Sequence, residues 1–235
     1  MSDVSISEAH AHGSSGGMAS VLYADGLAMR PLRRHIQAFA QAHVVKGSKV
    51  LDYGCGTEPY RHLFEGRGAA CIGADIDPGH DLRFEPDRPL PLADASIDCV
   101  VSFQVLEHVR DVGLYLREAR RVLKHTGSLL LSTHGTWPYH PHPQDFWRWT
   151  REGLRTVVED NGFRVRRITA VCGPAAWLAM FPLLVGKRLL GRAELLLAPL
   201  NLPVNVLAGL VDAVTPATVR EHNAAIYIVE AGISA

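Results

Sequence analysis

The 235-residue chain has few cysteines, no net charge and no long uninterrupted apolar run. Its cysteines stand singly at Cys55, Cys71, Cys99 and Cys172, a pattern that favours reduced thiols of a cytoplasmic protein over a disulfide framework or a zinc site. Positive and negative side chains balance, and the sequence lacks a long basic run. We therefore expect no nucleic-acid partner.

The sequence also lacks the hydrophobic segments of an exported or membrane-spanning protein. Residues 1–20 are rich in Ser, Gly, Ala and His, which predicts a flexible tail and no secretion signal. Apolar residues are concentrated in 174–220, but prolines and polar residues interrupt them, which argues against a transmembrane helix. We predict a helical insertion there that packs beside a pocket, forms a homodimer face or touches membrane lipid.

A glycine-rich turn follows the first strand-like apolar run, residues 49–53. Asp52 lies near the end of this run, and Gly54, Cys55 and Gly56 form the turn. Glycine lets a ligand approach the bare backbone, and amides at the start of the next helix are free hydrogen-bond donors. The turn predicts a ligand site at the end of the first strand.

Two further apolar runs end in residues suited to the same site. Asp75 and Ile76 follow the second run, about 20 residues after the glycines, where a nucleotide-binding α/β unit places a carboxylate for ribose hydroxyls. Phe103 and Gln104 end the run at 97–103. Open α/β sheets bind ligands at the carboxyl ends of such strands, so these residues are expected to converge.

Five segments resemble, in order and spacing, the class I S-adenosylmethionine-dependent methyltransferases of the type 11 methyltransferase-domain family. The segments are 50–56, 73–75, 90–98, 106–109 and 121–129. The resemblance implies S-adenosylmethionine as cofactor and a doubly wound, Rossmann-like α/β fold. Its sheet would have seven mostly parallel strands, with the last antiparallel. On this resemblance the cofactor-binding residues are Asp52, Gly54, Cys55, Gly56, Asp75, Ile76, Phe103 and Gln104.

The chain departs from the family at one position of the turn. Glu58 stands where the family usually carries a third glycine. Its carboxylate is expected beside the methionine end of the cofactor.

Residues 21–235 are predicted to form a single methyltransferase domain. A helical cover at 21–46 precedes the first strand, and the apolar insertion at 174–220 separates the sixth strand from the seventh. Apolar spacing predicts a helix over 112–123, which Gly127 is expected to end. 

An aromatic, histidine-rich stretch at 132–150 follows the fifth predicted strand. It contains three histidines, three tryptophans and three prolines. A rigid aromatic wall with imidazoles is typical of a substrate pocket. Because histidine is the best-suited base near neutral pH, we predict His134 and His140 as catalytic residues. The alternative is that either histidine only hydrogen-bonds the backbone.

A metal site is a second interpretation of the residues nearby. Gln104, Glu107 and His108 resemble the Glu-x-x-Glu-His segment of ubiquinone-pathway O-methyltransferases and small-RNA 2′-O-methyltransferases, where a divalent metal orients hydroxyls. In this chain Gln104 replaces the first glutamate. Glu107 and His108 would therefore bind a metal together with His142 and Asp145. The favoured interpretation is a metal-free helix start, and no metal ligand is assigned.

The favoured function is methyl transfer from S-adenosylmethionine to an oxygen, in preference to a nitrogen, of a small-molecule acceptor. The acceptor classes are a small metabolite, a sugar and a lipid-linked or glycolipid-like molecule, and the apolar insertion favours a hydrophobic one. One alternative is a non-catalytic, cofactor-binding interaction module whose insertion docks a partner. Nucleic-acid methylation is the third hypothesis, and the balanced charge argues against it.

Overall fold

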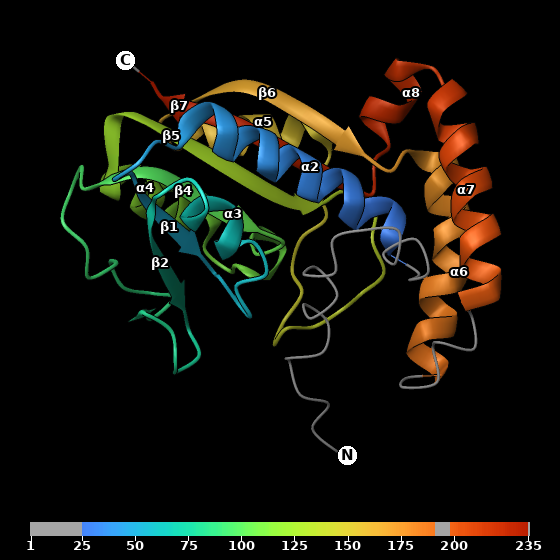
Figure 1. Cartoon of the computed structure of the whole chain (residues 1–235), viewed down its shortest axis with the longest axis horizontal. Coiled ribbons are helices and arrows are strands. Elements are labelled where there is room, and N and C mark those ends of the chain that lie inside the picture. Colours follow the sequence, from blue (N-terminus) through green and yellow to red (C-terminus); the bar gives the residue numbers. More distant parts are fainter. Residues whose placement is uncertain (1–24, 191–197, 235) are drawn as a thin grey trace.

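The computed structural model describes residues 25–190 and 198–234, so the predicted tail at 1–20 lies outside the described residues. Within these ranges seven strands form one sheet in the order β3-β2-β1-β4-β5-β7-β6 (Figure 1). The strands are β1 (Lys49–Tyr53), β2 (Ala70–Asp75), β3 (Leu82–Arg83), β4 (Ile97–Phe103), β5 (Leu123–His134), β6 (Phe163–Val171) and β7 (Ile226–Ile233). Only β7 runs antiparallel to its neighbours, β5 and β6. The predicted seven-stranded, mostly parallel sheet is confirmed.

Helices cover both faces of the sheet. They are α2 (Gly26–His43), α3 (Arg61–Glu65), α4 (Val112–Val122), α5 (Arg151–Asp160), α6 (Pro174–Leu190), α7 (Ala198–Val214) and α8 (Ala217–His222), with a 3₁₀ turn, η3 (Leu106–His108). Side chains alternate across β5: Leu129 and Leu131 join the core under α4 and α5, whereas Leu130 joins the core under α2, α3 and α6. The sheet is thus the buried middle layer of three.

The junction between α4 and β5 differs from the prediction. Gly127 does not end the helix, because α4 ends at Val122 and β5 begins at Leu123. Leu123 already pairs with Ile97 of β4, so the chain passes directly from helix to strand. A Cβ atom at Gly127 would lie 2.6 Å from the Leu123 side chain, so the glycine permits a close approach within the strand.

The insertion between β6 and β7 consists of α6, α7 and α8. Helices α6 and α7 pack against each other at one end of the sheet and protrude beyond it (Figure 1). Among the helices of the described ranges, none combines the length and the hydrophobicity of a membrane-spanning segment. Five apolar side chains, which we call the α6–α7 apolar face, are nevertheless 63–82% exposed. They are Leu178, Leu189, Leu207, Leu210 and Val214.

Candidate functional site

The turn after β1 forms a bare backbone surface. Gly54 and Gly56 adopt left-handed φ angles of 79° and 50°, which glycine accepts without strain. The amides of Gly54 and Cys55 donate to the carbonyl of Ala74 at 2.8 and 3.1 Å, which fixes the turn to the end of β2. A Cβ atom at Gly54 would lie 2.6 Å from the Val105 side chain. A residue larger than glycine would therefore disturb both the turn and its neighbour.

Acidic groups gather around this turn. Asp75, at the end of β2, accepts a hydrogen bond from the Gly56 amide at 2.8 Å. Burial, together with the charges of Glu58 and Asp75, raises the pKa of Asp52 to about 7. A cationic ligand would relieve the repulsion among these carboxyl groups. The donor set therefore fits a cofactor that carries a sulfonium and an amino group.

The end of β4 supplies an unpaired acceptor. Gln104 has a left-handed φ of 57°, a conformation that is costly for a residue with a side chain and is often found at ligand sites. Its amide Nε2 donates to Ser132 Oγ at 2.8 Å, whereas its Oε1 is buried with no protein partner. Phe103 packs its ring against Tyr60 at 5.1 Å, and Ile76 is partly buried at the end of β2. Gln104 Oε1 is thus available to a ligand.

A histidine cluster, consisting of Glu107, His134 and His140, lies at the end of β5. His134 Nδ1 lies 2.8 Å from Glu107 Oε1 and 3.2 Å from His140 Nε2. Thr133 Oγ1 donates to the second carboxylate oxygen of Glu107 at 2.8 Å. The Trp137 ring stacks on the His134 imidazole, with 4.6 Å between ring centroids. Only 3% of His134 is exposed, so its orientation is fixed on all sides.

The pKa values of Glu107 and His140 are both shifted within this cluster. Burial alone would raise the pKa of Glu107, but the adjacent His134 outweighs that effect and holds the pKa below its usual range. Burial, followed by the charges of His134 and His108, lowers the pKa of His140 to about 3. An ionised carboxylate and a neutral imidazole therefore flank His134. A carboxylate beside an imidazole is the arrangement in which an imidazole serves as a general base in many enzymes.

The loop that carries His140 is held by an ion pair. Arg148 contacts both oxygens of Asp145 at 2.6 Å and donates to the carbonyls of Trp137 and Pro138 at 2.9 and 2.8 Å. The same carboxylate accepts the His140 amide at 2.9 Å. The Asp145 carboxylate thus serves to hold this loop in place.

The alternative metal set is not assembled as the sequence suggested. The described residues contain two groups of candidate metal ligands, and inside each group the ligand atoms lie within 4.8 Å of one another. Neither group contains His108, His142 or Asp145. His108 Nδ1 instead lies 2.6 Å from the Gln144 carbonyl. Glu107, the remaining member of that alternative, belongs to the histidine cluster.

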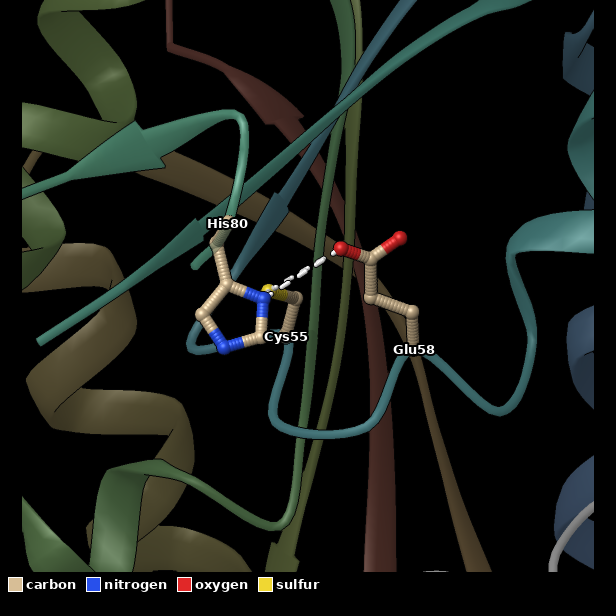
Figure 2. A group of neighbouring side chains, drawn as sticks. All are labelled: Cys55, Glu58 and His80. Atoms are coloured by element: carbon tan, nitrogen blue, oxygen red, sulfur yellow. Dashed lines mark hydrogen bonds and ion pairs between the residues drawn. The ribbon is translucent and has the colours of Figure 1, made fainter. Parts of the chain in front are cut away.

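A second polar group, the cysteine cluster, consists of Cys55, Glu58 and His80 (Figure 2). Glu58 has a left-handed φ of 55°, which explains why the family usually has glycine there. Its Oε2 pairs with Arg61 Nη1 at 2.6 Å. Its side chain lies against Gly73 of β2, where a Cβ atom would clash with the carboxylate. The charge expected beside the cofactor is therefore paired and held against β2.

The structure brings the predicted site residues to the carboxyl ends of β2, β1, β4 and β5, four neighbouring strands. Asp52 lies in β1, next to its final residue, and Asp75 ends β2. The turn residues follow β1, Phe103 and Gln104 lie at the end of β4, and His134 ends β5. Sequence reasoning did not predict that Glu107 and Trp137 would contact His134, or that His80 would approach Cys55. The histidine-rich loop was the available signal for Trp137, whereas no periodic pattern links residues 55 and 80.

A doubly wound sheet with a glycine turn after β1, an acid after β2 and an antiparallel β7 defines the class I methyltransferase architecture. A protein-family model for the methyltransferase domain matches residues 25–168, and the chain belongs to this family. S-adenosylmethionine is the cofactor of the class, so the predicted family and cofactor are confirmed at this level.

Named relatives agree with this assignment. A protein of Mycolicibacterium smegmatis named as an S-adenosylmethionine-dependent methyltransferase is 37% identical over 113 residues, covering 43% of this chain and 44% of that relative. The ubiquinone biosynthesis O-methyltransferase of Azorhizobium caulinodans is 32% identical over 108 residues, covering 38% and 41%. The matched region thus spans less than half the length of each of these relatives.

A solved structure shows the same fold over more of the chain. The 1,6-didemethyltoxoflavin-N1-methyltransferase of Burkholderia thailandensis, with bound S-adenosylhomocysteine, superposes with a TM-score of 0.53. The superposition covers 86% of this chain and 78% of that structure, at 15% sequence identity. At this identity the similarity shows a shared fold.

Proposed function

We propose that the chain transfers a methyl group from S-adenosylmethionine to a hydroxyl oxygen of a lipid-linked or glycolipid-like acceptor, with His134 as the general base. The observation that carries this proposal is the histidine cluster at the end of β5. An ionised, fully buried Glu107 contacts His134 there, beside the strands that carry the family's cofactor residues.

The end of the sheet has suitable groups to hold the cofactor. The Asp75 carboxylate has acceptor capacity left for ribose hydroxyls, since an ionised carboxylate can accept about four hydrogen bonds. The glycine turn allows close approach of a ligand, and Gln104 Oε1 is an unpaired acceptor. The acidic surroundings of Asp52 favour a positive charge. When bound, S-adenosylmethionine supplies an electrophilic methyl group on a sulfonium sulfur.

The chain's own task is to orient the acceptor and remove its proton. His134 takes the proton from the acceptor hydroxyl as the oxygen forms its bond to the methyl carbon. Glu107 stabilises the imidazolium that results, and the products are a methyl ether and the neutral thioether of the cofactor. Trp137 holds the imidazole plane through its stacked ring. General base catalysis of this kind contributes about 10²–10⁴ in rate.

An aromatic path joins this base to α6. The Trp137 ring lies 5.7 Å from Trp177, which lies 5.5 Å from Phe181, and 43% of Phe181 is exposed. An apolar tail could therefore lie along α6 while its polar head reaches His134. This continuity supports a lipid-linked acceptor over a free sugar.

The exposed apolar side chains of α6 and α7 are suited to contact with a lipid surface. Leu207 and Leu210 on α7 are 64% and 63% exposed, which is unusual for leucines that serve only the fold. We assign the α6–α7 apolar face to peripheral contact with the membrane that holds the acceptor. The prediction of a homodimer on the same face is the competing outcome.

Alkyl glucosides of increasing chain length, incubated with tritiated S-adenosylmethionine, test the acceptor class. We expect labelled methyl ethers, with turnover that increases from methyl to octyl to dodecyl glucoside. Phe181→Ala should remove most of the chain-length dependence. Labelling independent of chain length would contradict the lipid-linked acceptor. Cofactor binding without labelling of any acceptor would favour the interaction module.

Vesicle flotation tests the membrane contact separately. The double variant Leu207→Glu, Leu210→Glu should lose binding to phosphatidylglycerol vesicles. Val45→Glu is the matched control, because Val45 is 68% exposed but lies outside the α6–α7 apolar face. A dimer that the double variant disrupts, without vesicle binding, would assign this face to a second copy of the chain.

A further inference from the structure

The cysteine cluster converges three different ligand types on one point beside the cofactor turn. His80 Nδ1 lies 3.4 Å from Cys55 Sγ and 3.4 Å from Glu58 Oε1, and the sulfur lies 3.9 Å from the same oxygen (Figure 2). The nitrogen–oxygen separation is long for a hydrogen bond, since such bonds most often measure about 2.9–3.0 Å. A thiol is a weak hydrogen-bond donor, so the three groups are joined by weak hydrogen bonds.

The three separations match the edges of a zinc coordination tetrahedron. Zinc binds sulfur at about 2.3 Å and nitrogen or oxygen at about 2.0–2.1 Å, so tetrahedral angles place sulfur about 3.5 Å from the other ligands. The same bond lengths place nitrogen about 3.3 Å from oxygen. The observed distances of 3.4, 3.4 and 3.9 Å need only small adjustments to match these edges.

Neighbouring side chains orient the Glu58 carboxylate as a metal ligand. Its Oε2 is held by Arg61, at 2.6 Å, so that Oε1 alone faces the sulfur and the imidazole. Arg61 in turn pairs with Glu65 and Asp81, both at 2.7 Å. Such outer contacts orient the ligands of protein metal sites. They also explain why a left-handed position, favourable to glycine, carries a glutamate.

We propose that Cys55, Glu58 and His80 bind a zinc ion, which fastens the glycine turn after β1 to the loop after β2. Binding displaces the thiol proton of Cys55 to solvent, and the thiolate, the carboxylate and a neutral imidazole each give one electron pair to the metal. The fourth tetrahedral position is left to water. The site is independent of the methyl acceptor and of the histidine cluster.

Cobalt(II), a spectroscopic substitute for zinc, provides the test on the 235-residue chain without cofactor. We expect one cobalt ion per chain, with a thiolate-to-cobalt charge-transfer band and tetrahedral ligand-field bands that added zinc abolishes. Zinc should also raise the melting temperature, since a ligand of the folded state stabilises it. His80→Ala should weaken zinc binding at least 100-fold and abolish the band. His125→Ala, which removes an exposed histidine on β5, is the matched control.

A second variant keeps all three ligands. Gly73→Ala adds a Cβ atom against the Glu58 carboxylate and should displace it, so zinc affinity should fall while the variant remains folded by circular dichroism. Cobalt spectra without the thiolate band would overturn the proposal and move the metal to the histidine cluster. Equal zinc affinity of His80→Ala and His125→Ala would also overturn it. Neither outcome depends on methyl transfer.

Discussion

The histidine cluster and the cysteine cluster both lie where strands of the sheet end, and both contain a glutamate and an imidazole. In the histidine cluster, His134 Nδ1 lies 2.8 Å from Glu107, close enough for the two groups to share a proton. In the cysteine cluster, the corresponding nitrogen–oxygen distance is 3.4 Å, and a sulfur completes the triangle. The two clusters thus differ in the nitrogen–oxygen distance and in the third group, which is an imidazole in one and a thiol in the other.

Burial strengthens this difference. Glu107 is fully buried, with one oxygen beside His134 and the other accepting from Thr133. About 19% of the Glu58 side chain and 19% of the His80 side chain are exposed, which leaves an approach for an ion. The buried Glu107 is thus closed to solvent, whereas the partly exposed Glu58 can exchange partners.

Removal of the base should give the largest effect. His134→Ala should lower kcat by about 10²–10⁴, because the acceptor hydroxyl loses its proton acceptor. Steady-state methyl transfer to dodecyl glucoside measures this change. Binding of S-adenosylhomocysteine should stay within about threefold of the unmodified chain. A kcat close to that of the His125→Ala control would show that His134 is not the base.

Removal of the carboxylate behind the base should have a smaller effect. Glu107→Gln keeps the size of the side chain but withdraws the negative charge that stabilises an imidazolium. We expect kcat to fall by about 10–100-fold, with little change in the acceptor KM, since Glu107 acts through His134. Glu107→Asp should recover part of the rate if charge is the cause. An equal loss in both variants would indicate a packing role instead.

The acidic group around the cofactor turn should respond to pH in the opposite sense to ordinary carboxylates. The folded-state pKa of Asp52, about 7, lies above its ordinary value near 3.8, so between these values the folded chain binds more protons than the unfolded chain. Stability should therefore fall as pH rises from 5 to 8, by roughly 2 kcal/mol from this group.

Urea unfolding at pH 5 and pH 8 measures that change. In Asp52→Asn the difference between the two pH values should be smaller by the same amount, because the amide does not titrate. An equal pH dependence in both proteins would mean that Asp52 is ionised throughout the range.

Restoration of the family's glycine should change stability least. Glu58→Gly removes the strain of a left-handed glutamate but also its partly exposed ion pair with Arg61, and each is worth about 1 kcal/mol or less. We expect the free energy of unfolding without metal to change by less than about 1 kcal/mol. Zinc should no longer raise the melting temperature. A zinc-dependent rise equal to that of the unmodified chain would contradict the ligand role of Glu58.

Much of the fold could be predicted because it rests on local pattern. The apolar run before Gly54 and the acid at Asp75 each predicted a strand end, and parallel strands bring such ends to one edge of the sheet. Gly127 misled the prediction of the end of α4, because a glycine that permits close packing within a strand resembles a helix terminator.

The contacts that decide the chemistry could not be predicted in the same way. Glu107 and His134 are 27 positions apart, and Cys55 and His80 are 25 apart, on segments joined only by the sheet. The single cysteines argued against a zinc site because sequence reasoning recognises ligands by short spacings. Which oxygen of Glu58 faces Arg61 depends on packing against Gly73, which no periodic pattern encodes.

Calorimetric titration with S-adenosylhomocysteine tests most directly whether the cofactor binds at the ends of β1 and β2. We expect micromolar binding to the unmodified chain and its loss in Asp75→Ala, since Asp75 is the proposed ribose acceptor and holds the Gly56 amide at 2.8 Å. The neighbouring exposed variant Asp77→Ala should bind normally. No binding to the unmodified chain, or equal binding to both variants, would show that the cofactor does not bind at this edge of the sheet.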